Sequence, residues 1–136
     1  MKVLFVCKGN VGRSQMAEAF LKKYSSKYKV KSAGYAPGYW VGRNLDMTKY
    51  VKVCMDEEDI NVRHKISKKI TKRMVDWAEK IIVFDSKKQD WPDFLRNSIK
   101  VETWEVDDPR HGDLEVHRKT RDNIKKRVQS LVNDIS

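Results

Sequence analysis

The sequence predicts an α/β fold in which one four-stranded parallel sheet is covered by helices on both faces. Two observations lead to this prediction. Short apolar runs alternate with longer segments of helical periodicity, and the first apolar run leads through a glycine-containing loop into a helix. This alternation favours parallel pairing with right-handed crossovers. The length of 136 residues suits a single domain over residues 1–136.

The first part of the chain supplies two of the four strands. Val3–Val6 is a short continuous apolar run, typical of a strand buried on both faces. Apolar residues then recur at three- and four-residue steps, so a helix is expected over residues 13–26. Residues 28–32 alternate as the second strand. The glycines and proline of residues 33–44 predict a long loop, and such loops often carry function.

The rest of the chain continues the alternation. A helical face shared by Met47, Tyr50, Val51 and Cys54 predicts the next helix and makes Cys54 a core residue. The remaining expected elements are a helix over 71–79, a strand over 81–84, a helix over 85–97 interrupted at Trp91-Pro92, a strand over 99–106 and a helix over 114–135.

The carboxyl ends of the predicted strands should form the functional edge of the sheet. Ligands of open parallel sheets bind beyond these ends. Cys7 and the segments after Ser32, Phe84 and Val106 all follow predicted strands. We therefore expect these four parts of the chain to meet.

The chain is strongly basic, with 29 Lys and Arg against 19 Asp and Glu and a formal net charge of +10. This charge favours anionic partners, but no recognisable nucleic-acid module accompanies it, so we do not expect nucleic acid. The sequence contains no apolar run long enough for a membrane span and no signal peptide. A cytoplasmic monomer is expected. The two cysteines lack the spacing of a zinc site, a redox pair or a disulfide framework.

The run Cys7-Lys8-Gly9-Asn10-Val11-Gly12-Arg13-Ser14 predicts an anion-binding loop between the first strand and the first helix. Backbone N–H groups of such a loop can turn inward, and the helix N-terminus adds positive dipole at the same place. Gly9 and Gly12 permit unusual dihedrals, and Asn10 tolerates the left-handed region. Arg13 can grip two oxygens of a phosphate group.

Cys7 is the candidate nucleophile of this loop. The backbone dipoles and Arg13 favour the thiolate, the reactive form of cysteine. Ser14 can donate to that thiolate or cap the helix. A leaving oxygen needs an acid, and Asp108, which precedes a proline, follows the last predicted strand. The predicted catalytic set is therefore Cys7, Arg13 and Asp108.

These residues resemble the low-molecular-weight protein tyrosine phosphatase family, whose superfamily includes thioredoxin-coupled arsenate reductases and protein arginine phosphatases. The family pattern Cys-x-Gly-Asn-x-x-Arg-Ser appears at residues 7–14, its Asp-Pro acid at 108–109 and its Ser-Ala-Gly at 32–34. The resemblance implies a flavodoxin-like sandwich and a reaction without metal or cofactor. It implies that Cys7 forms a phosphocysteine, that Arg13 and the loop amides hold the phosphate, and that Asp108 protonates the leaving group.

The resemblance also assigns supporting residues. A buried Asn–Ser–His network of the family is similar to Asn10, Ser14 and His64 here. Four residues are expected to flank the substrate. They come from an aromatic-containing loop and from the positions after Asp-Pro, and they are Tyr39, Trp40, Arg110 and His111. The last two replace aromatics that are common in the family. This replacement suggests a substrate with more anionic groups around its phosphate.

Besides Arg110 and His111, three positions depart from the family pattern in ways that bear on the activity. Gly12 stands where many members have a second cysteine that protects the nucleophile. Gln15 after the serine is closer to the arsenate reductase branch, yet residues 81–94 contain no cysteine to pass electrons onward. Val11 stands where arginine phosphatases tend to carry threonine.

The sequence therefore predicts hydrolysis of phosphotyrosine in proteins or of a small aryl phosphate, with inorganic phosphate as product. Three alternatives stay open. One is arsenate reduction, in which Cys54 or an external thiol would resolve the adduct on Cys7. The second is hydrolysis of phosphoarginine, and the third is a phosphoprotein-binding module without turnover.

Overall fold

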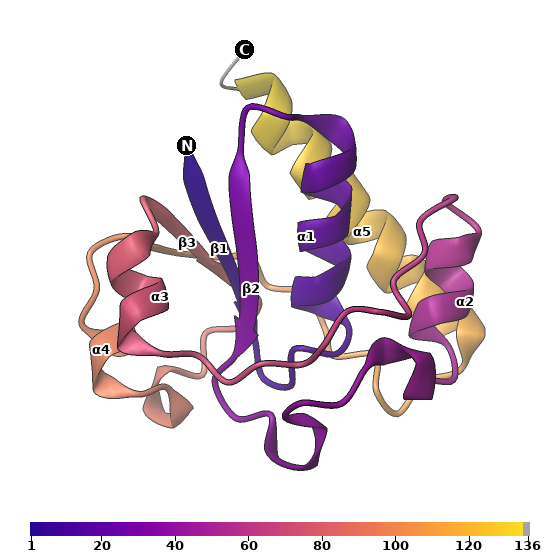
Figure 1. The fold of residues 1–136 in the computed structure, drawn as a ribbon, viewed down its shortest axis with the longest axis horizontal. Coiled ribbons are helices and arrows are strands. Elements are labelled where there is room, and N and C mark those ends of the chain that lie inside the picture. The colour runs from indigo at the N-terminus through magenta and orange to yellow at the C-terminus, as the bar shows by residue number, and fades with distance from the viewer. Residues whose placement is uncertain (135–136) are drawn as a thin grey trace.

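The structure, a computed structural model, describes residues 1–134 and contains one parallel sheet (Figure 1). Its strands, in the spatial order β2-β1-β3-β4, are β1 (Lys2–Cys7), β2 (Lys29–Gly34), β3 (Lys80–Val83) and β4 (Val101–Thr103). The predicted four-stranded parallel sheet is confirmed. Because β1 and β3 are central and covered on both faces, their sequences are continuously apolar rather than alternating.

Helices cover both faces of the sheet (Figure 1). On one face lie α1 (Arg13–Tyr24), α2 (Val51–Asp56) and α5 (Leu114–Asp134), and on the other lie α3 (Lys72–Trp77) and α4 (Asp93–Arg96). Successive residues of β1 serve the two cores in turn: Val3 and Phe5 pack with the first group of helices, and Leu4 and Val6 with the second. The fold is a flavodoxin-like three-layer sandwich.

The segment expected as a helix over 85–97 is helical mainly at α4. The Asp85 carboxylate accepts hydrogen bonds from the Tyr35 hydroxyl at 2.8 Å and from Trp91 Nε1 at 3.3 Å, which hold the chain after β3 as a loop. Trp91 is extended, with ψ of 149°, as expected for a residue before proline. The helix therefore starts only after Pro92.

The helix expected from the apolar face of Met47 to Cys54 begins only at Val51. Cys54 is fully buried, so its assignment to the core is confirmed. Met47 lies instead in a short 3₁₀ turn (Leu45–Met47) and is half exposed. The apolar pattern thus predicted one helix where the structure has two segments: a helix that packs on the core, and preceding residues that line a pocket.

The last helix follows its predicted register. Ile124, Val128 and Leu131 of α5 are buried against the core, while the expected extension to Ile135 lies outside the described residues. Along residues 1–134, none of the helices combines the length and the apolar character needed to cross a membrane.

Candidate active site

Asn10 and Gly34 shape the loop between β1 and α1. Asn10 has a φ of 53°, in the left-handed region that asparagine tolerates better than most residues. Gly9 and Gly12, expected to need such angles, do not adopt a positive φ. Gly34 is the sterically required glycine, because a Cβ there would lie 2.7 Å from the Lys8 carbonyl oxygen and 3.0 Å from Asn10 N. Its missing side chain lets β2 approach the loop.

Cys7 ends β1 with its side chain buried at the centre of this loop. Its Sγ accepts a hydrogen bond from the Asn10 N–H at 3.2 Å and lies 3.0 Å from Ser14 Oγ. Since Ser14 Oγ already accepts from Asn10 Nδ2 at 2.8 Å, its own proton is free to point at the sulfur. Ser14 also lies in the first turn of α1, whose positive dipole end faces the thiol. These donors and the helix N-terminus are placed to stabilise negative charge on the sulfur during a reaction.

The guanidinium of Arg13 is held by backbone carbonyls of the segments that follow β3 and β4. Nη1 donates to the carbonyl of Phe84, after β3, at 2.9 Å and to that of Val106, beyond β4, at 3.0 Å. The side chain is nearly buried, and its Nη2 lies 3.6 Å from Asp108 Oδ2. The expectation that the segments following separate strands meet at the carboxyl edge of the sheet is confirmed.

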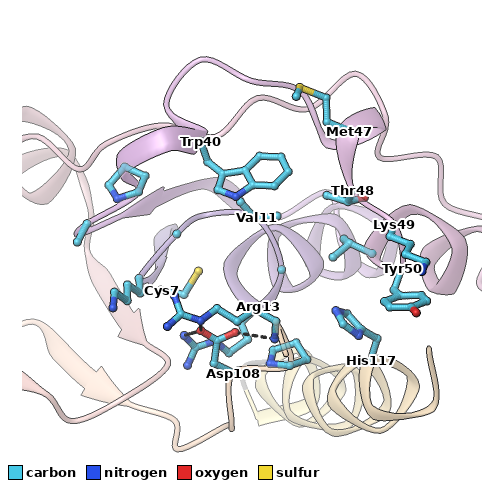
Figure 2. Close-up of a pocket in the computed structure, with 18 residues that line it drawn as sticks. Cys7, Val11, Arg13, Trp40, Met47, Thr48, Lys49, Tyr50, Asp108 and His117 are labelled. Carbon is cyan, nitrogen blue, oxygen red and sulfur yellow. Dashed lines mark hydrogen bonds and ion pairs between the residues drawn. The ribbon is translucent and has the colours of Figure 1, made fainter. Parts of the chain in front are cut away.

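A pocket of about 410 Å³ opens above the thiol. Figure 2 shows Cys7, Arg13 and Asp108 together at one end, with Trp40 on the opposite wall and Tyr50 and His117 at the far end. Within residues 1–134, no three or more His, Cys, Asp or Glu side chains are grouped so that they could hold a metal ion.

Asp108 occupies the wall of the pocket with about a third of its side chain exposed. Its Oδ2 lies 3.6 Å from Arg13 Nη2 and 3.7 Å from Arg110 Nε, and its Oδ1 accepts the Arg110 N–H at 3.0 Å. The neighbouring carboxylate, Asp107, is exposed and does not line the pocket. Only one carboxyl of the pair can therefore meet a group bound over Cys7.

A family model described as low molecular weight phosphotyrosine protein phosphatase matches residues 2–136. The chain belongs to this family. It is 28% identical over 142 residues to the protein-arginine-phosphatase of Geobacillus stearothermophilus, covering 96% of this chain and 93% of that protein. It is 32% identical over 128 residues to arsenate reductase 1 of Bacillus cereus, covering 93% and 90%. The crystal structure of a YwlE mutant from Bacillus subtilis has a TM-score of 0.86 at 27% identity, covering 99% and 98%.

The expectation that His64 joins the buried network of this phosphatase family is wrong. His64 is exposed at the tip of a turn that the buried Val62 anchors. The Asn10 side chain instead donates to Ser14 Oγ and, at 3.0 Å, to Ser32 Oγ. The loop is thus braced from β2 rather than by a histidine.

Ser32 extends the network to a buried carboxylate that sequence reasoning missed. Its hydroxyl donates to Glu18 Oε1 at 3.0 Å, and the Lys65 ammonium lies 2.6 Å from the same oxygen. Burial alone would raise the pKa of Glu18, but the charge and hydrogen bond of Lys65, together with the charges of Lys22 and Lys68, hold that pKa below its ordinary value of 4.5. Glu18 stays ionised and holds Ser32, and through it Asn10, in place. The sequence did contain a signal for this carboxylate, because Glu18 is an acidic residue within the apolar pattern of α1.

Replacing Glu18 with glutamine is expected to destabilise the fold most near neutral pH. A carboxyl whose pKa is lowered by folding contributes stability above its unfolded pKa, and that contribution is lost as the pH falls. The variant leaves the mostly buried Lys65 side chain, 13% exposed, without its carboxylate partner, so urea unfolding at neutral pH should show a loss of about 3 kcal/mol. Wild type should lose stability as the pH falls below about 5, through the unfolded pKa of a glutamate and then the lower pKa of folded Glu18, and the variant should lose less.

The more exposed pair of Glu102 and Lys80 provides the matched control for Glu18. Glu102→Gln should cost at most about 1 kcal/mol. Equal losses in the two variants would contradict the role assigned to Glu18. Combining Glu18→Gln with Lys65→Met should restore part of the stability, because no unpaired charge then stays buried.

Two of the four expected flanking residues line the pocket. Trp40 and Arg110 do so, whereas Tyr39 and His111 do not, and for these two the expectation is wrong. Tyr39 is 65% exposed and stacks with the Arg43 guanidinium, 3.8 Å from its ring centroid. The His111 ring accepts a hydrogen bond from Arg110 Nε at 3.1 Å, outside the pocket lining.

The far end of the pocket was not predicted from the sequence. It is formed by Met47, Thr48, Lys49, Tyr50, Val51 and His117. Tyr50 and His117 face each other, with ring centroids 5.1 Å apart, and His117 Nδ1 lies 2.8 Å from the Asp113 carbonyl oxygen. Since a carbonyl only accepts, Nδ1 is the donor. The sequence contained one usable signal. The helix α5 begins soon after Asp108, so the first turn of this helix stays near the site.

Proposed function

We propose that this protein is a cysteine-dependent, metal-independent phosphatase that hydrolyses phosphotyrosine or other aryl phosphate esters through a phosphocysteine intermediate. One observation carries the proposal: Cys7, Arg13 and Asp108 converge at one end of a pocket beside an anion-binding loop. The family description and the similarity to a protein-arginine-phosphatase support it at the level of a phosphatase. The two free cysteines agree with a reducing compartment, so a cytoplasmic location is part of the proposal.

The first step transfers the phosphoryl group to sulfur. The Cys7 thiolate attacks phosphorus, a P–S bond forms, and the P–O bond to the leaving group breaks. Asp108 gives its proton to the leaving oxygen. Arg13 and the loop N–H groups hold the other phosphoryl oxygens as charge redistributes, while Ser14 donates to the sulfur.

The second step returns the enzyme to its starting state. Asp108, now ionised, takes a proton from a water molecule whose oxygen attacks phosphorus. The P–S bond breaks, inorganic phosphate leaves, and the Cys7 thiolate is regenerated. The same carboxyl thus acts first as acid and then as base, which needs its position on the pocket wall.

The pocket walls support an aryl leaving group. Val11 and the indole of Trp40 line the space above the thiol and provide apolar contact for a ring. Phosphoarginine is the second candidate, because a matched relative is a protein-arginine-phosphatase. Val11 offers no hydroxyl to hydrogen-bond with a guanidine group, which favours the aryl ester.

Cys54 is poorly suited to the chemistry of an arsenate reductase. It is fully buried, its thiol donates to the Val51 carbonyl, and burial raises its pKa to about 11. A thiol that stays protonated and covered at neutral pH would not attack an adduct on Cys7.

A substrate panel tests the proposal. Specificity constants should be measured for peptides that carry phosphotyrosine, phosphoserine or phosphoarginine, with thioredoxin-coupled arsenate reduction as a separate assay. Phosphotyrosine should exceed phosphoarginine by about tenfold or more. A higher constant for phosphoarginine would establish the second candidate instead. Tight peptide binding with neither a phosphate burst nor steady turnover would identify a binding module.

A further inference from the structure

The mouth of the pocket carries positive charge from three separate loops. Lys8 follows β1, Lys49 precedes α2, and Arg110 follows the Asp-Pro pair, and all three are exposed pocket-lining residues. We call these three residues the basic rim. Asp108 is the only carboxylate among the described residues that line the same pocket. The rim therefore presents an excess of cationic groups around the opening.

The charges of the basic rim are largely uncommitted. Several basic side chains elsewhere have carboxylate partners, as in the pairs of Arg63 with Asp56 and of Arg118 with Glu57. Neither Lys8 nor Lys49 has a carboxylate at ion-pair distance among residues 1–134; the Lys49 ammonium lies 5.2 Å from the centroid of the Tyr50 ring (Figure 2).

Arg110 differs from the two lysines because its carboxylate partner is the proposed acid. Its Nε lies 3.7 Å from Asp108 Oδ2. A second carboxylate arriving at the mouth could pair with Arg110 and leave Asp108 to the leaving group. The rim and the acid are therefore suited to a substrate that brings its own negative charge.

The phosphate group itself does not need the rim. Its charge is matched at the base of the pocket by Arg13, the loop N–H groups and the α1 dipole. The cations at the mouth thus face groups that flank the phosphate. Because the protein as a whole carries a formal charge of +10, its long-range field adds to the attraction of acidic partners.

We propose that the basic rim selects phosphorylated protein segments whose neighbouring residues are aspartate or glutamate. This inference rests on the proposed phosphatase function and specifies its substrate class. A phosphoprotein fits better than nucleic acid. The cations surround a pocket that leads down to a buried thiol, an arrangement suited to a phosphate on a projecting side chain rather than to a continuous phosphate backbone.

The test compares phosphotyrosine peptides of equal length flanked by glutamate, glutamine or lysine. At low salt the glutamate peptide should have a kcat/KM about tenfold above the glutamine peptide, mainly through KM, and the lysine peptide should be the poorest. At about 1 M salt the preference should nearly vanish, because the charges are screened.

Lys49→Gln and Lys126→Gln form a matched pair of variants. Lys126 is exposed on α5, nine residues beyond His117 and so about 13 Å farther along the helix axis. Lys49→Gln should reduce the glutamate preference by about twofold to threefold, and adding Lys8→Gln should reduce it further. Lys126→Gln should leave it unchanged.

Three outcomes would overturn the inference. The first is equal kcat/KM for all three peptides at low salt in an enzyme that turns over p-nitrophenyl phosphate. The second is an equal loss of preference in the Lys49 and Lys126 variants, which would point to net charge alone. The third is stronger inhibition of peptide hydrolysis by a single-stranded oligonucleotide than by polyglutamate of equal charge. If neither p-nitrophenyl phosphate nor any peptide is hydrolysed, the proposed phosphatase function fails instead.

Discussion

Cys7→Ser is expected to lower the turnover of p-nitrophenyl phosphate by about 10⁵-fold, the largest effect of any single substitution in this protein. The serine hydroxyl would occupy the same place between the Asn10 N–H and Ser14, but it is not ionised near neutral pH and is a far weaker nucleophile. Steady-state rates and the amplitude of the p-nitrophenol burst measure the effect. The burst should disappear.

Cys54→Ala is the control for the loss of a thiol. Cys54 lies on the buried face of α2 and does not line the pocket, so this variant should keep its turnover with a modest loss of stability. Wild-type rates in Cys7→Ser, once contaminating phosphatase has been removed, would show that the proposed nucleophile is wrong.

Asp108→Asn is expected to have the second largest effect, because it removes the acid and the base in one change. Turnover of a phosphotyrosine peptide should fall by about 10²- to 10⁴-fold. The loss should be smaller in the burst with p-nitrophenyl phosphate, since nitrophenolate leaves without needing a proton. Comparing the two leaving groups separates proton donation from a general disturbance of the pocket.

Asp107→Asn supplies the matched control for the acid. Asp107 carries the same charge at the adjacent position but is exposed and outside the pocket lining. Its substitution should change turnover by less than about threefold, in line with a surface position. If the two variants lose activity equally, or if Asp108→Asn slows both substrates to the same extent, the assignment of Asp108 as proton donor does not hold.

Most of the candidate residues that lie together as expected are local in sequence. Cys7, Asn10, Arg13 and Ser14 belong to one strand-loop-helix unit, so their proximity follows from chain connectivity. Asp108 was found because the carboxyl ends of parallel strands meet at one edge. The Cys54 prediction held because a helical period identifies buried positions when the helix packs on the core.

The incorrect predictions concern side chains whose direction depends on packing between distant elements. The turn anchored by Val62 leaves His64 in solvent, and the loop around Gly38 turns Tyr39 outward while Trp40 faces the pocket. A residue pattern gives no information on which of two neighbours a loop turns inward. The same is true of Tyr50 and His117, which meet only because α2 packs beside α5.

The α/β sandwich and the anion loop could be predicted from the sequence, because both follow from short-range periodicity and from consecutive residues. How the loop is held, and what surrounds it, depends on contacts made only in the folded chain. The carbonyls of Phe84 and Val106 orient Arg13, the ion pair of Glu18 with Lys65 braces Asn10 through Ser32, and loops far apart in sequence build the basic rim. These contacts join residues that come together only once the sheet has formed and the helices have packed against it.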